Sequence, residues 1–311
     1  MANIWDQTIA LSSDTITMLL KTQFNIVVTT LKLIGEGFDN TAFLINDQYV
    51  FRFPRRAEAL PLIENEIAIL PYLAPQLPFA LSTPTFIGQP TSAYPYPFAG
   101  YPFLPGEILT QAQNTLVDNL TFATTLGTWL RALHQVPVRH SDRAHQPERT
   151  NWRLNLTHRT QRVIEVTTQY QKYFVQAGFE IATLQKKMEH FKTLNFENPE
   201  ASAYIHNDLY AKHILVDAQN MPVALIDWGD CQIGNPAIDL SIGIMILTPE
   251  LLPHFKKAYG APSPQDMHIA HFVAYCHAIT ALSYFAQIEE THTLAWTKAA
   301  LQNCLALFPK A

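Results

Sequence analysis

The sequence predicts an α+β protein, with strands gathered in its first third and helices in most of the remainder. Residues 27–53 are strand-like runs in which apolar and polar positions alternate between short turns. From Asn114 onward the composition becomes helical, with an apolar stripe at Leu116, Leu120, Ala123, Leu126, Leu130 and Leu133. At 311 residues, 48% apolar and 15% charged, the chain can bury the core of one large or two smaller domains.

Charge and cysteine content exclude several classes of protein. A net charge of −5 argues against a general nucleic-acid binder. The three scattered cysteines fit neither a disulfide framework nor a zinc site. The N-terminal residues do not have the pattern of a signal peptide, and no apolar run reaches the length of a membrane span. We therefore expect a cytoplasmic protein with no nucleic-acid or membrane partner.

The first elements combine strands with a glycine turn. A short helix is expected over residues 14–24, followed by a strand, a turn containing Gly35 and Gly37, and a second strand that begins near Asn40. Glycine lets the backbone approach a ligand closely, so that main-chain N–H groups can bond phosphate oxygens. Many ordinary hairpins also contain such a turn.

The next strand and helix carry two charged candidates. In the strand at residues 48–54, a period of two places Val50 and Arg52 on the same face. In the helix predicted over residues 57–73, Glu66 lies among apolar positions, and Glu66, Leu70 and Leu73 follow an E-x-x-x-L-x-x-L spacing. Arg52 could instead be an exposed residue of an edge strand, and Glu66 a solvated one.

The densest set of polar candidates lies at residues 204–240. His206, Asp208 and His213 surround a short loop before the apolar strand at 214–216, and Asp227 follows a second strand at 223–226. Two acids at the mouths of two paired strands suit phosphoryl transfer, in which one carboxylate orients an attacking hydroxyl and another holds Mg²⁺. Taken singly, an H-x-D triplet arises by chance, Asp227 could be a turn residue, and Asp239 could cap a helix.

The motifs of this stretch resemble a known superfamily. His206, Asp208 and His213 are similar to the H-x-D-x-x-x-x-N catalytic loop of the aminoglycoside phosphotransferases and protein-kinase-like enzymes. The I-D-W-G-D at residues 226–230 resembles their metal-binding motif, and residues 234–240 resemble the G-[DN]-P-x-x-D-[LI] that follows it. One departure is His213 in place of Asn. Macrolide phosphotransferases of the same superfamily also show H-x-D-x-x-x-x-H.

The resemblance covers about residues 30 to 305 and implies a bilobal protein-kinase-like fold. Residues 1–104 would form a small mixed N-lobe with an antiparallel sheet, and residues 105–311 a larger, mainly helical C-lobe. A hinge at the end of the N-lobe would hold the nucleotide base through the backbone at Tyr101, Phe103 and Leu104. Because such recognition is by backbone groups, the sequence does not distinguish ATP from GTP.

The same resemblance implies roles for the other candidates. Asp208 would be the catalytic residue, with His206 bracing its loop. His213 and Asp227 would hold Mg²⁺, with Mn²⁺ as an alternative because an imidazole is an unusual Mg²⁺ ligand. The nucleotide would be bound by the glycine turn, the residue that covers its base, and the ion pair that steadies its phosphates: Gly35, Gly37, Asn40, Val50, Arg52 and Glu66.

The implied reaction moves the γ-phosphoryl group of a nucleoside triphosphate to a hydroxyl of a small molecule, an antibiotic of the aminoglycoside or macrolide type. Kinases of metabolites such as homoserine, choline or a sugar amine remain an alternative. A nucleotide-binding pseudokinase is another, because Arg52 and His213 stand where Lys and Asn are usual. A metal-dependent hydrolase would leave the glycine turn, Glu66 and the hinge unexplained.

Overall fold

The computed structural model describes residues 11–37, 39–111, 115–144, 152–194 and 203–308. Phe38, which the glycine-turn motif includes, lies outside them. Contacts divide the chain into two compact units, of which the first comprises Met1–Gln76, Ala80–Pro105 and Leu225–Cys231 and the second Leu77–Phe79, Gly106–Ala224 and Gln232–Ala311. The first unit thus extends to Pro105 and also contains Asp227, which the sequence analysis assigned by position to the C-terminal part.

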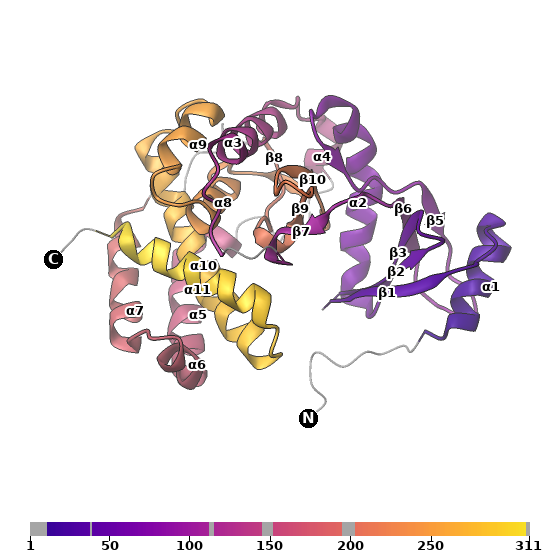
Figure 1. The fold of residues 1–311 in the computed structure, drawn as a ribbon, viewed down its shortest axis with the longest axis horizontal. Coiled ribbons are helices and arrows are strands. Elements are labelled where there is room, and N and C mark those ends of the chain that lie inside the picture. The colour runs from indigo at the N-terminus through magenta and orange to yellow at the C-terminus, as the bar shows by residue number, and fades with distance from the viewer. Residues whose placement is uncertain (1–10, 38, 112–114, 145–151, 195–202, 309–311) are drawn as a thin grey trace. The chain divides into compact units, whose positions relative to one another are not determined.

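The first unit is built on an antiparallel sheet of five strands in the order β1-β2-β3-β6-β5. Two helices, α1 and α2, flank the strands (Figure 1). Its elements are α1 (Ser13–Phe24), β1 (Leu31–Glu36), β2 (Asn40–Ile45), β3 (Tyr49–Pro54), η1 (Ala57–Ala59), α2 (Leu60–Leu73), η2 (Ala74–Gln76), β4 (Ala80–Leu81), β5 (Phe86–Gly88) and β6 (Phe98–Pro102).

Alternation along β3 separates the core of this unit from its polar face. Phe51 and Phe53 are fully buried and pack with Ile16, Leu19 and Leu20 of α1. Because successive strand residues point to opposite faces, Val50 and Arg52 lie on the other side, as the sequence predicted. On α2, Ile63 packs with Ala99 and Tyr101 of β6. Arg52 is therefore directed toward the side of the sheet opposite the apolar core.

The second unit is mainly helical, with short strands around the polar loop. β10, β9 and β7 lie side by side in that order, and β8 pairs with β11. Its elements are β7 (Glu107–Ile108), η3 (Leu109–Gln111), α3 (Leu120–Gln135), α4 (His140–Ala144), α5 (Leu156–Gln169), α6 (Gln171–Gln176), α7 (Ile181–Lys187), η5 (Met188–Thr193), β8 (Ala203–Ile205), η6 (Ala211–His213), β9 (Ile214–Val216), β10 (Pro222–Leu225), β11 (Gln232–Gly234), α8 (Ala237–Ile246), α9 (Leu252–Tyr259), α10 (Pro264–Gln287) and α11 (Thr291–Ala306).

Helix α10 is the central element of this unit and packs on α8, α11 and α5 (Figure 1). It begins with a capping box in which Ser263 and Asp266 satisfy each other's backbone N–H groups. Among the described helices, α10 is the one long and apolar enough to cross a bilayer, and 72% of its most apolar window is buried inside the protein. Such burial is typical of the core helix of a soluble protein.

Close packing of α3 against α9 fixes the end of α3. A Cβ atom at Gly127 would lie 2.5 Å from the Phe255 carbonyl oxygen, so only glycine allows the two helices to approach this closely. This packing sets the position of His134, in the last turn of α3.

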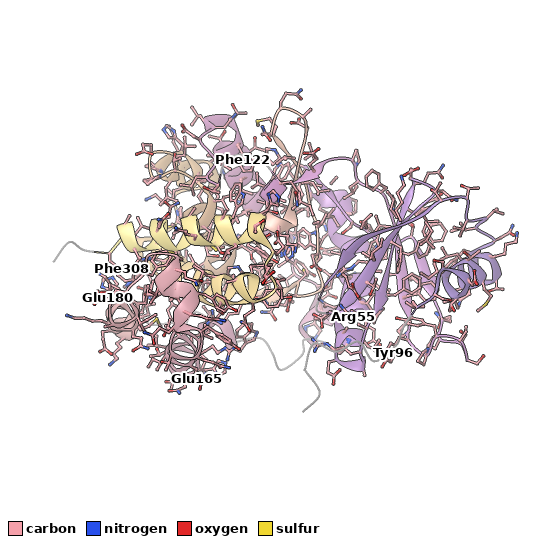
Figure 2. The ribbon with its side chains drawn as sticks, turned by 60° about the horizontal axis from the view of Figure 1, so that its bottom comes forward. Arg55, Tyr96, Phe122, Glu165, Glu180 and Phe308 are labelled. Carbon is pink, nitrogen blue, oxygen red and sulfur yellow. The ribbon has the colours of Figure 1, made fainter. Side chains whose placement is uncertain are left out.

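An aromatic and histidine cluster surrounds Phe308, just beyond α11 (Figure 2). The Phe308 ring lies 5.4 Å from that of Phe191, and 4.6 Å from that of His271. His271 is buried, and its Nε2 donates to the Cys304 carbonyl at 2.8 Å. The cluster holds the C-terminal helix against α10.

The fold agrees with the predicted α+β class of a kinase-like protein. The strands and helices lie where the apolar periodicity placed them, including the hairpin of β9 and β10. The short helix α4 follows α3, in a segment for which the sequence analysis gave no element. Its Asp142 accepts hydrogen bonds from the nearby Arg139 side chain and from the Tyr204 hydroxyl, and the second contact is with a distant residue that local pattern does not indicate.

Candidate active site

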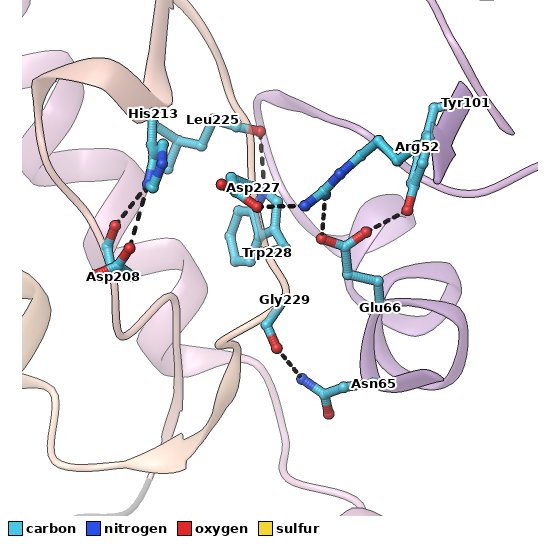
Figure 3. A network of polar contacts seen from close by, with 10 residues as sticks. All are labelled: Arg52, Asn65, Glu66, Tyr101, Asp208, His213, Leu225, Asp227, Trp228 and Gly229. Atoms are coloured by element: carbon cyan, nitrogen blue, oxygen red, sulfur yellow. Dashed lines mark hydrogen bonds and ion pairs between the residues drawn. The ribbon is translucent and has the colours of Figure 1, made fainter. Parts of the chain in front are cut away.

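The polar face of the first unit centres on Arg52, which bridges two carboxylates (Figure 3). Its Nη1 donates to Glu66 Oε1 at 2.6 Å, and its Nη2 donates to Asp227 Oδ1 at 2.6 Å. The Glu66 side chain is 1% exposed, whereas that of Asp227 is 46% exposed. Arg52 therefore joins one carboxylate that is inside the protein to one that remains accessible.

Burial and charge act in opposite directions on these groups. Burial alone would lower the pKa of Arg52, but the carboxylates of Glu66 and Asp227 outweigh it and raise that pKa well above its usual value. Burial also raises the pKa of Glu66, an effect that the charge of Arg52 opposes. Arg52 thus stays charged. Because burying two charges is costly, the ion pair of Arg52 and Glu66 depends on the hydrogen bonds that it makes.

Two further contacts hold this network. The Tyr101 hydroxyl donates to Glu66 Oε2, so that the buried carboxylate has a second partner. Next to Glu66 on α2, Asn65 Nδ2 donates to the Gly229 carbonyl at 3.1 Å and also to that of Cys231. These bonds fasten the segment after Asp227 to α2. Asp227 itself has a left-handed backbone, with φ of 63°.

The glycine turn at the end of β1 would accept a Cβ atom at ordinary van der Waals distances. A Cβ at Gly35 would meet nothing closer than 3.9 Å, and one at Gly37 nothing closer than 3.6 Å. Packing within the chain therefore does not require glycine here, which suits a backbone that a ligand approaches. The Gly37 N–H donates to the carbonyl of Asn40, and the Arg55 guanidinium donates to the carbonyl of Gly37.

At the predicted hinge, the backbone and side-chain roles differ. Tyr101 pairs with Val50 between β6 and β3, and the Tyr101 side chain is 1% exposed. The Phe103 N–H donates to the Gln48 carbonyl at 2.8 Å, while the Phe103 side chain is 40% exposed. Tyr101 therefore acts through its hydroxyl on Glu66. The backbone contact of Tyr101, Phe103 and Leu104 with a base stays a prediction.

In the second unit, the polar loop is fastened by a buried acid of α8. Asp239 is 1% exposed, and its carboxylate accepts from the backbone N–H groups of His206 at 2.7 Å and Asn207 at 2.8 Å. His134 Nε2 lies 3.1 Å from the same carboxylate, and its Nδ1 lies 3.0 Å from the Tyr259 hydroxyl. Asp239 therefore holds the loop from behind and does not cap its helix, the alternative that the sequence left open.

The side chain of Asp208 projects from this loop and is 26% exposed. Its Oδ1 accepts from Nη2 of Arg153 at 2.8 Å. The Asp208 carbonyl accepts a hydrogen bond from Nδ1 of His213 at 2.7 Å (Figure 3). The predicted base is thus a partly accessible carboxylate whose orientation is fixed by one arginine.

The His213 contact also bears on metal binding. Because a carbonyl oxygen can only accept, Nδ1 carries the proton and Nε2 keeps its lone pair, the tautomer of a histidine that binds a metal. No group of three metal-binding side chains gathers anywhere in the described ranges. A metal at His213 or Asp227 would therefore need oxygen ligands from a bound molecule, as Mg²⁺ commonly takes from nucleotide phosphates.

Comparison with known proteins decides the family. The sequence pattern described as "Phosphotransferase enzyme family" (APH) matches residues 30–271 of this chain, most of its length. The protein belongs to this family. Its fold is that of the solved members. The GDP and kanamycin complex of APH(2")-IIia superposes with a TM-score of 0.68 at 21% identity, covering 94% of this chain and 98% of that one.

A second structure of the family and one sequence relative extend the comparison. A macrolide 2'-phosphotransferase type I superposes with a TM-score of 0.61 at 24% identity, covering 94% of this chain and 98% of that chain. The uncharacterized protein YcbJ of Bacillus subtilis (strain 168) is 31% identical over 103 residues, which are 31% of this chain and 34% of YcbJ. The match thus spans about a third of that curated relative.

Several residues of this phosphotransferase-family site were not singled out by the sequence. Asp239 was matched to a motif without a role, although an acid between Ile238 and Leu240 in a fully buried helix must have polar partners. Arg153 was missed because it lies 55 residues from Asp208, and no local pattern marks it. Asn65 stands beside Glu66 on α2 and could have been noticed as a polar residue flanking a buried one.

Proposed function

We propose that this member of the family transfers the γ-phosphoryl group of ATP or GTP to a hydroxyl of a small molecule in the cytoplasm. Antibiotics of the aminoglycoside or macrolide type are the first acceptors to consider, because solved relatives include an aminoglycoside enzyme in complex with kanamycin and a macrolide 2'-phosphotransferase. The observation that carries the proposal is the partly exposed Asp208 on a loop whose backbone is fixed by the buried Asp239.

The proposal gives each half of the site its own task. Asp208 accepts the proton of the acceptor hydroxyl as the oxygen attacks the γ-phosphorus atom, and the bond from that atom to the bridging oxygen of the nucleoside diphosphate breaks. Arg52, held by Glu66 and Tyr101, faces the phosphates with a fixed positive charge. His206 supports the loop and does not react, because its side chain is fully buried.

The residues present also fit the divalent ion that the family implies. Asp227 offers an accessible carboxylate and His213 an imidazole in the tautomer that can bind a metal. When bound with the nucleotide, Mg²⁺ or Mn²⁺ would neutralise phosphate charge. Since the described residues supply few ligands of their own, we expect metal affinity to depend on the nucleotide.

The test is nucleotide consumption with Mg²⁺, using ATP and GTP separately across a panel of macrolides, aminoglycosides and hydroxylated metabolites, with mass spectrometry of the product. Replacing Asp208 by Asn removes the base while keeping shape, so we expect turnover to fall by about 10²–10⁴-fold. A phosphorylated product formed by Asp208→Asn at the rate of the unmodified protein would refute the assignment.

A pseudokinase is the second candidate, and one contact favours it. Arg52 Nη2 binds the same Asp227 carboxylate that the metal would need, at 2.6 Å. If this ion pair persisted with nucleotide present, the protein would bind nucleotide without transferring phosphate. Stabilisation by nucleotide that is unaffected by Mg²⁺, with no product across the panel, would favour this candidate over the enzyme.

A further inference from the structure

The described surroundings of Asp208 include an arginine, a histidine and aromatic rings. Arg153 is the direct partner of its carboxylate, and the Arg153 side chain is 11% exposed. The Trp152 ring contacts the guanidinium groups of both Arg153, at 4.6 Å, and Arg159, at 5.1 Å. Arg159 is 5% exposed. Arg153 therefore pairs with the Asp208 carboxylate, while Arg159 packs on the other guanidinium's aromatic neighbour, Trp152.

Local structure builds Arg153 into this position. Residues 152–154 form a 3₁₀ turn, and Leu154 within it is buried. Asn155 follows as the N-cap of α5, its side chain accepting from the His158 N–H at 2.9 Å. The movement of Arg153 is limited on one side by the Asn155 cap and the buried Leu154. On the other side it is limited by the Trp152 ring. Arg153 is held as part of the site and is not a mobile surface side chain.

The remaining neighbours of Asp208 in the second unit are uncharged or paired. The Tyr210 ring lies 4.3 Å from that of His213 and 5.0 Å from that of His277. Burial lowers the pKa of His277 to about 4, although the Asp208 carboxylate opposes this, so His277 is neutral at pH 7. Glu290 caps α11 and lies 3.9 Å from Lys212. The Oε2 atom of Glu290 is buried and accepts no hydrogen bond from a described residue, so Lys212 is the cation that offsets its charge.

Two buried nitrogen atoms near Asp208 have no partner that the structure describes, and that of Arg153 is a donor. Nε of Arg153 and the Nε2 atom of His277 are buried and have no hydrogen-bond partner among the described residues. Buried polar atoms normally find partners, so such atoms next to a predicted base indicate where oxygen atoms of a ligand would bind. Hydroxyl, ether or carboxylate oxygens suit a guanidinium N–H, whereas the ammonium groups of a polycation do not.

Granting the phosphotransferase function proposed above, we propose that Arg153 selects the acceptor by charge. It neutralises the carboxylate that would otherwise attract cations, so that the site takes an alcohol with little or no positive charge, rich in hydroxyl or ether oxygens. Polycationic acceptors are disfavoured. A macrolide fits this class better than an aminoglycoside.

The experiment measures binding of a polycation, kanamycin, and of a macrolide, erythromycin, by isothermal titration calorimetry at low ionic strength. The protein is saturated with Mg²⁺ and a non-hydrolysable nucleotide analogue. Arg153→Gln removes the charge, Arg153→Lys keeps it, and Arg162→Gln removes a comparable charge from an exposed position of α5. Thermal unfolding verifies that each variant is folded.

We expect Arg153→Gln to bind kanamycin about tenfold more tightly than the unmodified protein. One unit charge at roughly 6 Å changes affinity by about threefold at an effective dielectric constant of about 80, and by about a hundredfold at about 20. Arg153→Lys and Arg162→Gln should bind kanamycin as the unmodified protein does. If the role of Arg153 were merely structural, Arg153→Lys would not keep the affinity of the unmodified protein. Erythromycin affinity should change less than kanamycin affinity.

Equal kanamycin affinity in Arg153→Gln and the unmodified protein, including no binding by either, would overturn the proposal. So would an unmodified protein that binds kanamycin more tightly than erythromycin. Because binding does not require turnover, the charge selection can be upheld or rejected even if no acceptor is phosphorylated. A lack of phosphorylation would count against the proposed function alone.

Discussion

The two polar networks of this protein hold their functional groups in different ways. In the first unit, Arg52, Glu66, Tyr101 and Asp227 are joined side chain to side chain. In the second, the carboxylate of Asp239 binds backbone N–H groups of the loop that carries Asp208. The first arrangement holds a charge between two carboxylates, whereas the second fixes the path of the chain.

This difference suits two different tasks. A cation that faces phosphates must be able to change partners when a nucleotide and a metal arrive, and Arg52 shares its two Nη atoms between one buried and one accessible carboxylate. A base must keep one position, because small displacements of a reacting group are costly. We therefore expect changes in the first network to affect nucleotide affinity, and changes in the second to affect folding and turnover.

The largest effect on stability is expected from Asp239→Asn. An amide offers one oxygen and an NH₂ group to a position that receives two backbone N–H groups and the His134 ring, so a donor would face a donor. We expect a loss of about 3 kcal/mol in the free energy of unfolding, measured by urea denaturation.

Asp217→Asn is the matched control for this change. Asp217 also accepts two backbone N–H groups, from Gln219 and Met221 at 2.9 Å, but in a turn that is largely exposed. Its replacement should cost less than about 1 kcal/mol, because water can satisfy the groups that lose a partner. Equal losses in the two variants would show that burial of the Asp239 carboxylate is not what matters.

An intermediate effect is expected from Arg52→Lys. An ammonium group is a compact charge without the planar fork that reaches both Glu66 and Asp227, so the new side chain should hold one carboxylate and release the other. We expect Mg-nucleotide affinity to fall about ten- to hundredfold, or roughly 1.4–2.7 kcal/mol, in a calorimetric titration.

Arg162→Lys, at an exposed site on α5, should leave nucleotide affinity unchanged. Unaltered affinity in Arg52→Lys would mean that the fork geometry is not used. If Arg52→Lys lowered the free energy of unfolding as much as Asp239→Asn does, both networks would serve stability, and the contrast between them would not hold.

The smallest effect concerns pH and the cluster around Phe308. Burial lowers the pKa of His271 from 6.5 to about 4. The folded state therefore binds fewer protons than the unfolded state between these values, and the contribution to stability is complete above about pH 6.5 and is lost as pH falls toward 4. Between pH 7 and pH 5, we expect His271 to account for a loss of about 2 kcal/mol in the free energy of unfolding.

His271→Gln keeps a donor for the Cys304 carbonyl but does not titrate. Its free energy of unfolding, followed by urea denaturation from pH 7 to pH 5, should decline less steeply than that of the unmodified protein. Parallel declines would show that His271 is not the source of the pH dependence. The decline that remains is expected to include His277, whose pKa is lowered in the same direction.

Local pattern predicted the elements of this fold and the residues that adjoin them. Alternation in β3 was enough to put Val50 and Arg52 on one face, whereas Glu66 was singled out because its E-x-x-x-L-x-x-L spacing resembles that of the family, and it is buried against Arg52. The three motifs at residues 206–240 identified the family, which the match to residues 30–271 confirms. In each case the signal lies within a few residues of sequence.

Partners distant in sequence could not be predicted in this way. Asp239 and His206 are 33 residues apart, and Arg153 and Asp208 are 55 apart, so each contact depends on how helices pack. For Tyr101, the backbone contact with a base stays a prediction, but the structure adds a hydroxyl bond to Glu66 that depends on the register of β6 with β3. Packing, which the pattern of one segment does not encode, decides these contacts.

The central claim, that nucleotide binding and acceptor activation belong to separate networks, is tested most directly in Asp208→Asn. Its affinity for Mg²⁺ with a non-hydrolysable ATP or GTP analogue should be measured beside its rate of phosphoryl transfer. We predict an affinity equal to that of the unmodified protein with turnover lost. Turnover retained, or affinity and turnover lost together in a folded protein, would contradict the claim.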